Sequence, residues 1–313
     1  MAKAQLKEDV KETTPLPAAS SVPTVVSAER ALPAELQVPD DAAFAELSGL
    51  GNEQVTRDDL ATPFLFILQD LSPQVKRTEA KYVEGAQAGM FFNSVTRQLY
   101  DGALGLEIID CYFEPLLTKW TPRDKGGGFK GVVEPSDPIL KRCRNKVRDG
   151  KETQTLITPD GDEINNINQH YLLVRPYTKD AALNPYPWQP VCLGLGSTQI
   201  KKSKQLNAQL NLERVRTADG RIVPIPRFGV VWRLATVPER NQTGSWFGIQ
   251  FERLRRVNAA ELQEGVAFYK AVSSGERRVK PSEETHPPAE DAGRGPPSSN
   301  GDPGPGLEDQ IPY

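Results

Sequence analysis

The chain has 313 residues, of which 38% are hydrophobic and 25% charged, and its formal net charge is −3. This length suits one large domain or two small ones, and the low hydrophobic fraction predicts disordered ends. There is no run of about 18 apolar residues, which excludes a transmembrane helix. Residues 1–10 lack the apolar core of a secretory signal, so we expect no membrane partner.

The cysteines and histidines are few. Cys111, Cys143 and Cys192 are odd in number and far apart, and the only histidines are His170 and His286. This pattern predicts a reducing, cytoplasmic environment and argues against a disulfide framework or a zinc site. We therefore expect neither a metal nor another cofactor.

Charge is distributed unevenly along the chain. Residues 1–56 carry −5 (4 Lys and Arg against 9 Asp and Glu), residues 57–272 carry +6 (30 against 24), and residues 273–313 carry −4 (4 against 8). A basic centre between acidic ends is typical of a body that binds a polyanion, although +6 over so long a segment is also compatible with ordinary charge scatter.

Three segments follow from composition and hydrophobic period. Residues 1–55 are predicted to form a largely disordered, acidic N-terminal arm. Residues 56–272 form the folded body, and residues 273–313 a disordered Pro- and Gly-rich tether. The body is expected to begin with a helix over residues 57–71, where apolar residues recur at helical spacing after a capping Thr56 or Asp58.

From Gly89 onward the hydrophobic period changes to two residues, which predicts strands. Strands are expected over residues 90–95, 98–100, 106–120, 170–174, 191–196, 228–237 and 245–257, with a hairpin turn at 241–244. Two more helices are expected, one over residues 197–214 and one over 258–271, with Ser197 and Asn258 as their caps.

Several strands, one helix and a final hairpin is the element order of an OB-fold. We therefore predict a mainly β, α+β body with a few helices, built as an elaborated OB-like β-barrel between disordered N- and C-terminal tails. Periodicity alone leaves another small barrel or a mixed sheet open.

Aromatic and cationic side chains are interleaved on the predicted strands and loops. Single-stranded nucleic acids bind such surfaces because bases stack on flat side chains, for about 1–3 kcal/mol each, while cations follow the phosphates. The candidate nucleic-acid contacts are Trp120, Arg123, Lys125, Phe129, Lys130, Lys141, Arg142, Arg144, Trp188, Lys201, Lys202, Lys204, Trp232, Arg233 and Trp246. A tryptophan on a strand can equally belong to the core, so Trp120, Phe129 and Trp188, which sit beside loops, are the stronger stacking candidates.

Signals for catalysis are weak. The sequence contains no G-x-S-x-G or H-E-x-x-H motif and no Cys/His pairing. Asp160, Asp162 and Glu163 could hold a metal ion, but Pro159 to Asp162 reads first as a turn. We predict a protein that is not an enzyme and has no catalytic residues.

The last residues are Glu308, Asp309, Gln310, Ile311, Pro312 and Tyr313. This tip resembles that of the bacterial single-stranded-DNA-binding proteins, which end in acids followed by Ile-Pro-Phe. It departs from that pattern at Tyr313, which replaces Phe, and at Gln310, where an acid is common. The resemblance implies a partner-binding tip in which Glu308 and Asp309 meet basic residues while Ile311, Pro312 and Tyr313 enter an apolar pocket.

A larger body with such a tail resembles the single-stranded-DNA-binding proteins encoded by bacteriophages. The resemblance implies binding and protection of single-stranded DNA during DNA replication, recombination and repair, in the cytoplasm of the host cell. Replication or repair proteins would be recruited through the tip, and homo-oligomerisation is left open. Two alternatives remain: a phage virion or assembly protein, and a metal-dependent nuclease or recombination enzyme.

Overall fold

The computed structural model describes residues 61–148, 150–179, 184–241 and 244–279, together with residues 42, 46, 47 and 50–55. The chain divides into two units, Met1–Gln54 and Val55–Tyr313, and the fold belongs to the second unit. Most of the predicted N-terminal arm and the tether from residue 280 onward, including the tip, lie outside the described residues.

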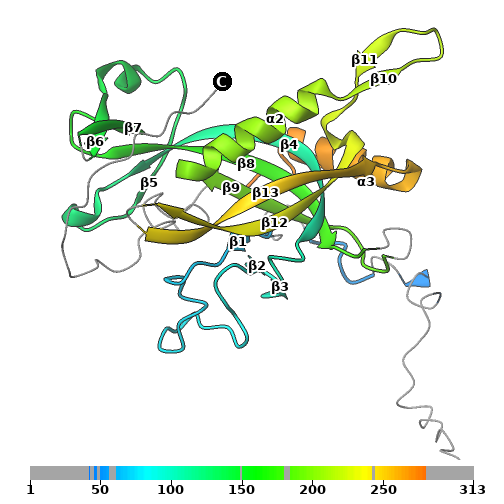
Figure 1. Cartoon of the computed structure of the whole chain (residues 1–313), viewed down its shortest axis with the longest axis horizontal. Helices are drawn as coiled ribbons and strands as arrows, with labels where there is room; N and C mark the ends of the chain where they lie inside the picture. The colour runs from blue at the N-terminus through cyan, green and yellow to red at the C-terminus, as the bar shows by residue number, and fades with distance from the viewer. Residues whose placement is uncertain are drawn as a thin grey trace, which may run out of the picture. The chain divides into compact units, whose positions relative to one another are not determined.

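Strands dominate the second unit (Figure 1). They are β1 Leu65–Ile67, β2 Phe91–Asn93, β3 Leu99–Tyr100, β4 Leu106–Trp120, β5 Phe129–Val133, β6 Arg144–Arg148, β7 Lys151–Ile157, β8 Glu163–Pro176, β9 Gln189–Gly196, β10 Arg214–Arg216, β11 Ile222–Pro224, β12 Val230–Asn241 and β13 Gly244–Arg256. The helices are α2 Ile200–Leu212 and α3 Ala259–Ser273, and the 3-10 turns are η3 Arg123–Lys125, η4 Pro138–Arg142, η6 Ser197–Gln199 and η7 Arg227–Gly229. The predicted mainly β, α+β class is confirmed. Neither helix in the described part of the chain is long and apolar enough to cross a membrane.

Both helices predicted in the second half of the body form. The helix expected over 197–214 is η6 followed by α2, and the one expected over 258–271 is α3. α3 begins with a capping box, in which the Asn258 side chain accepts from the backbone N–H of Glu261 and the Glu261 carboxylate accepts from that of Asn258. This exchange satisfies two N–H groups that have no partner inside the helix.

Five of the eight strands of the main sheet lie in the antiparallel order β9-β8-β4-β12-β13, which we call the central sheet, and α2 lies in the connection from β9 to β12. An OB-fold has three strands, a helix and a final hairpin in this order, and its fourth strand pairs with its first. Here the first strand is β4 and the fourth is β12. Among the described residues, however, no strand pairing joins β9 to β13. The sheet therefore does not close into a barrel, and the predicted OB-like barrel is not confirmed.

The segment around β1 lies between these two strands. On one side, the carbonyl of Pro63 accepts a hydrogen bond from the N–H of Cys192 on β9 at 2.8 Å, and Phe64 forms a parallel bridge with Cys192. On the other side, the Gln69 amide bonds the backbone N–H and carbonyl of Phe247 on β13, at 2.8 and 2.9 Å. The segment thus covers two sheet edges whose polar groups would otherwise have no strand partner.

The helix predicted over residues 57–71 is wrong in its described part, residues 61–71, which contains β1 instead. Phe64 and Phe66 contact the apolar cluster on one side of the sheet, whereas Leu65 and Ile67 contact the cluster on the other side. Successive side chains that point to opposite sides require the two-residue period of a strand. The apolar spacing allowed both readings, and the packing on two sides selects the strand.

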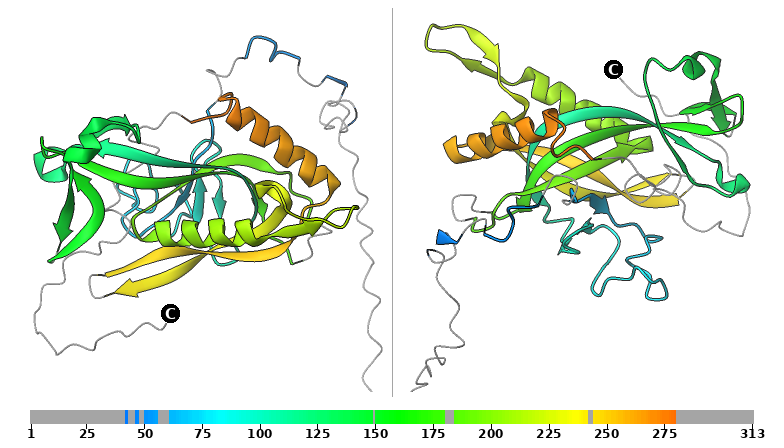
Figure 2. Two further views of the ribbon diagram at one scale, coloured as in Figure 1. Left: turned by 90° about the horizontal axis from the view of Figure 1, so that it is seen from above. Right: turned by 180° about the vertical axis from the view of Figure 1, so that it is seen from behind.

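α2 and α3 cover opposite faces of the central sheet (Figure 2). On one face, Leu206 and Leu210 of α2 join a cluster that includes Trp232. On the other face, Phe268 and Val272 of α3 pack against alternate residues of the same strands. Each such buried side chain contributes about 1.5–3 kcal/mol, so both helices are firmly attached.

The connection between β4 and β8, residues 121–162, is long and carries β5, η4, β6 and β7. We call it the arm. It extends from one end of the central sheet, and the β10–β11 hairpin projects beyond α2 at the other end (Figure 1).

Candidate nucleic-acid interface

Two of the predicted stacking tryptophans belong to the core. Trp120 and Trp232 are each only 2% exposed. The ring of Trp120 packs edge-on against the half-buried ring of Phe129, with centroids 5.1 Å apart. Neither indole offers a face to a ligand, so we leave both out of the candidate interface.

The other two tryptophans are half-buried and have partners. The Arg175 guanidinium lies 4.3 Å from the ring centroid of Trp188, which packs against the α3 side of the sheet. Trp246 donates from Nε1 to the Glu239 carboxylate at 2.8 Å. These contacts hold both indoles in place at the surface of the body, where each remains partly exposed.

Arg233 is engaged within the protein. Its guanidinium donates to the carbonyls of Leu104 and Ala103 at 2.8 and 2.7 Å, and it lies 4.8 Å from the ring centroid of Tyr177. It therefore fixes the loop before β4, and little of its hydrogen-bonding capacity is left for a phosphate.

Part of the arm's positive charge is neutralised. Lys130 and Lys119 lie 2.7 and 3.2 Å from the carboxylate of Asp162, and Lys146 lies 2.6 Å from that of Glu163. The hydrogen bond from Lys130, supported by Lys119, holds the pKa of Asp162 below its ordinary value despite the opposing effect of burial. Two of the three acids that the nuclease alternative requires are thus bound to lysines.

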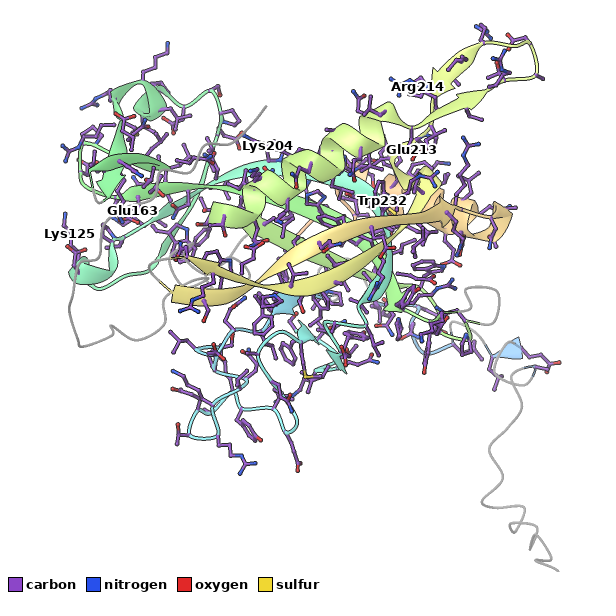
Figure 3. All side chains as sticks on the ribbon, viewed as in Figure 1. Lys125, Glu163, Lys204, Glu213, Arg214 and Trp232 are labelled. Atoms are coloured by element: carbon purple, nitrogen blue, oxygen red, sulfur yellow. The ribbon has the colours of Figure 1, made fainter. Side chains whose placement is uncertain are left out.

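Other cations remain available to solvent. Among the described residues, many exposed lysines and arginines form no ion pair with another described residue, and we call those on the arm, α2 and β10 the basic band. Its members are Lys125, Lys141, Arg142, Arg144 and Lys151 on the arm, Lys201 and Lys204 on α2, and Arg214 and Arg216 on β10. Figure 3 shows Lys125 on the arm, Lys204 on α2 and Arg214 at the start of β10, spaced along the long axis of the body.

Two more predicted cations fall outside this set, in addition to Lys130 and Arg233. Lys202 pairs with Glu239 at 3.3 Å, so α2 contributes two free lysines to the basic band and not three. Arg123 begins η3, and its side chain is not among those described.

A buried polar network links β4, β8 and α2, and the sequence reasoning missed it. Nδ1 of His170 lies 2.7 Å from the Asp110 carboxylate, and Nε2 lies 2.8 Å from the Ser203 hydroxyl. Arg227 donates to Asp110 at 2.6 Å and to Asn207 at 2.7 Å. A usable signal was present, because Asp110 interrupts an apolar strand and a buried carboxylate requires partners.

The order Asp110, His170, Ser203 resembles a nucleophile with its base and orienting acid. Ser203, however, is fully buried, and its hydroxyl also lies 2.8 Å from the amide nitrogen of Asn168. A nucleophile must reach its substrate, so we assign this network the structural role of fixing α2 on the sheet.

On the opposite face, buried charges fix α3 to the sheet. Arg175 lies 2.7 Å from the Glu107 carboxylate and 3.5 Å from that of Glu261, and Arg255 lies 2.6 Å from Glu261. An OB-fold commonly binds oligonucleotides on the outer face of its second and third strands, which correspond here to β8 and β9. α3 packs on this side of the sheet, chiefly against β4, whereas the basic band lies on the arm, α2 and β10.

The fold and the site define a mainly β protein with an OB-like strand order and a basic band along the body. A family model described as Pam3 phage gp34-like protein matches residues 28–278. This match spans most of the chain, so the chain belongs to the Pam3 phage gp34-like family, whose name indicates a phage protein. Comparisons with curated proteins and with solved structures find no match.

Proposed function

We propose that this phage protein binds single-stranded DNA along the basic band and protects it during replication, recombination and repair. The observation that carries the proposal is the distribution of free cations. Salt bridges neutralise Lys119, Lys130 and Lys146, whereas the members of the basic band remain exposed and form no ion pair with another described residue, although Arg214 and Arg216 donate to backbone carbonyls. Unpaired surface cations can release the counterions of a polyanion, which is the main source of sequence-independent affinity for nucleic acids.

The strand order supports the same assignment. In OB-folds the loop between the first and second strands takes part in binding oligonucleotides. The corresponding connection here is the arm, which carries five members of the basic band. α2 carries two more and lies on the face of the sheet opposite α3.

The proposal is tested by electrophoretic mobility shifts with labelled oligo(dT) and with duplex DNA of equal length, each with and without magnesium. We expect the protein to shift oligo(dT), and oligo(dT) to compete for the protein better than the duplex does. The affinity of the protein for oligo(dT) should fall as salt rises, and the oligonucleotide should remain intact with magnesium. Absence of a shift at low salt would overturn the proposal in favour of a virion or assembly role. Degradation of the oligonucleotide that requires magnesium would favour the nuclease alternative.

We also propose that the tip recruits a replication or repair protein to the bound DNA. The support is the sequence itself, in which Glu308 and Asp309 precede Ile311, Pro312 and Tyr313. A short acidic and apolar segment at the end of a Pro- and Gly-rich tether has the composition of a docking motif.

A further inference from the structure

Phe113 occupies an unusual position in this protein. It lies on β4 just beyond the register shift between Asp110 and Tyr112, and it pairs across the sheet with His170. Its ring is half-buried, yet it belongs to none of the three apolar clusters of the described residues. Packing into a hydrophobic core therefore does not explain this aromatic ring.

Polar groups hold the ring in place instead. The His170 ring packs edge-on against Phe113 with centroids 5.2 Å apart, and the Arg227 guanidinium lies 5.2 Å from the centroid of the Phe113 ring. His170 and Arg227 are themselves fixed by Asp110, which bonds to both of them. The buried network thus positions one partly exposed aromatic ring, and a fixed ring loses little conformational entropy when a flat ligand stacks on it.

The groups near Phe113 are those that a nucleotide requires. Pro115, two residues further along β4 and therefore on the same side, pairs with Asn168 across the sheet, and Asn168 is half-buried. On α2, Asn207 bonds Arg227 next to the ring, and Lys204 lies one turn earlier on the same side of the helix. A partly exposed aromatic ring and a free cation are therefore contributed by neighbouring parts of β4 and α2, while the amide nitrogen of Asn168 on β8 is already bonded to Ser203.

We propose that Phe113 is a base-stacking residue and that Lys204 contacts a neighbouring phosphate, so that together they bind one unpaired nucleotide. This inference rests on the proposed function and adds a reason for preferring single strands. A base inside a duplex has both faces covered by its neighbours, whereas a base in a single strand can be placed against the Phe113 ring.

The test compares oligo(dT) with an abasic oligomer of the same length, which keeps the phosphates and lacks the bases. The wild-type protein, Phe113→Leu and Phe251→Leu are titrated with both by fluorescence anisotropy. Phe251 is the matched control, because it is also half-buried on a strand but packs against the α2-side core. Thermal melting of each variant verifies folding.

We expect Phe113→Leu to bind oligo(dT) about tenfold more weakly than wild type, with its affinity for the abasic oligomer unchanged. Phe251→Leu should keep the wild-type preference for oligo(dT). An unchanged preference in Phe113→Leu would overturn the subsite while leaving the proposed function intact. If the wild-type protein binds neither oligomer, the proposed function fails as well.

A second variant provides a positive signal and does not depend on a loss of binding. In Phe113→Trp, the additional fluorescence relative to wild type should be quenched by oligo(dT) and not by the abasic oligomer. Equal responses to the two oligomers would contradict stacking at this position.

Discussion

Nδ1 of His170 lies 2.7 Å from the carboxylate of Asp110, in the buried layer between the central sheet and α2. This contact connects β8 to β4, and the other ring nitrogen of His170 extends the connection to Ser203 on α2. Asp110 also accepts from Arg227, which enters from η7. One carboxylate therefore links β4, β8, α2 and η7. Through His170 and Arg227 it also positions the ring of Phe113.

Asp110→Ala should destabilise the protein strongly. The change leaves the Arg227 guanidinium without its carboxylate partner and opens a space in a buried layer, and breaking a buried ion pair costs about 3–5 kcal/mol. Urea unfolding at neutral pH measures the loss. Asp219→Ala is the control, because Asp219 and Arg221 form an exposed pair, and exposed ion pairs contribute little to stability. Similar small losses for both variants would show that the network is not a structural anchor.

The stability of the protein should fall in acid, in part through Asp110. Burial alone would raise the pKa of this carboxyl, but Arg227 and His170 together hold it below its ordinary value. A carboxyl with a lowered folded-state pKa stabilises the fold above its unfolded pKa of about 4, and this contribution disappears as the pH falls through the folded-state pKa. The free energy of unfolding, measured from pH 5 downward, should therefore decline less in Asp110→Asn than in wild type. Parallel curves would contradict the account.

Lys204→Ala should weaken oligo(dT) binding and its salt dependence. Each phosphate contact to a single strand contributes about 0.7 to the slope of log affinity against log salt, so the slope should become less steep by about that amount. Lys270→Ala is the matched control, since Lys270 is an exposed lysine on α3, which packs on the opposite face of the sheet. Equal effects of the two substitutions would show that α2 and α3 do not differ in their contact with DNA.

Trp120→Ala should strongly destabilise the arm and the adjacent sheet. The folded variant should lose much less of its affinity for DNA. Trp120 is 2% exposed, and replacing a buried Trp with Ala costs about 3–5 kcal/mol. The measurement is the melting temperature, with oligo(dT) affinity determined below the transition. A variant with an unchanged melting temperature and much weaker binding would show that Trp120 contacts the DNA.

Removal of residues 306–313 should abolish partner recruitment and leave DNA binding intact or tighter. The deleted segment contains two acids, Glu308 and Asp309, that would compete with DNA for cations, and the proposed docking residues Ile311 to Tyr313. Pull-downs of purified replication and repair proteins, with and without the segment, measure recruitment. Identical pull-downs would refute the role of the tip.

Local signals in the sequence predicted much of the fold. The two-residue period of the segment after Phe228 and the turn at 241–244 predicted the β12–β13 hairpin, and Asn258 marked the start of α3. These features depend on neighbours in sequence, so they can be inferred without knowing the packing. β1 was missed because its strand form depends on packing against both sides of a distant sheet.

The kinds of side chain that form the candidate site were predictable from the sequence. The particular residues were less so. The free lysines Lys201 and Lys204 were identified from the sequence, whereas Lys202 and Lys130 turn out to be paired with acids distant in sequence. Phe113 was missed because its significance depends on Arg227, more than one hundred residues away. Ion pairing and burial are properties of the fold, and a one-dimensional pattern does not contain them.

The most direct test of the account is ultraviolet crosslinking of labelled oligo(dT), about 30 nucleotides long, to the intact protein, followed by identification of the crosslinked peptides. We expect crosslinks in peptides that contain Phe113 and α2, and in the arm between β4 and β8. Crosslinks confined to α3, or no crosslink at low salt, would contradict it.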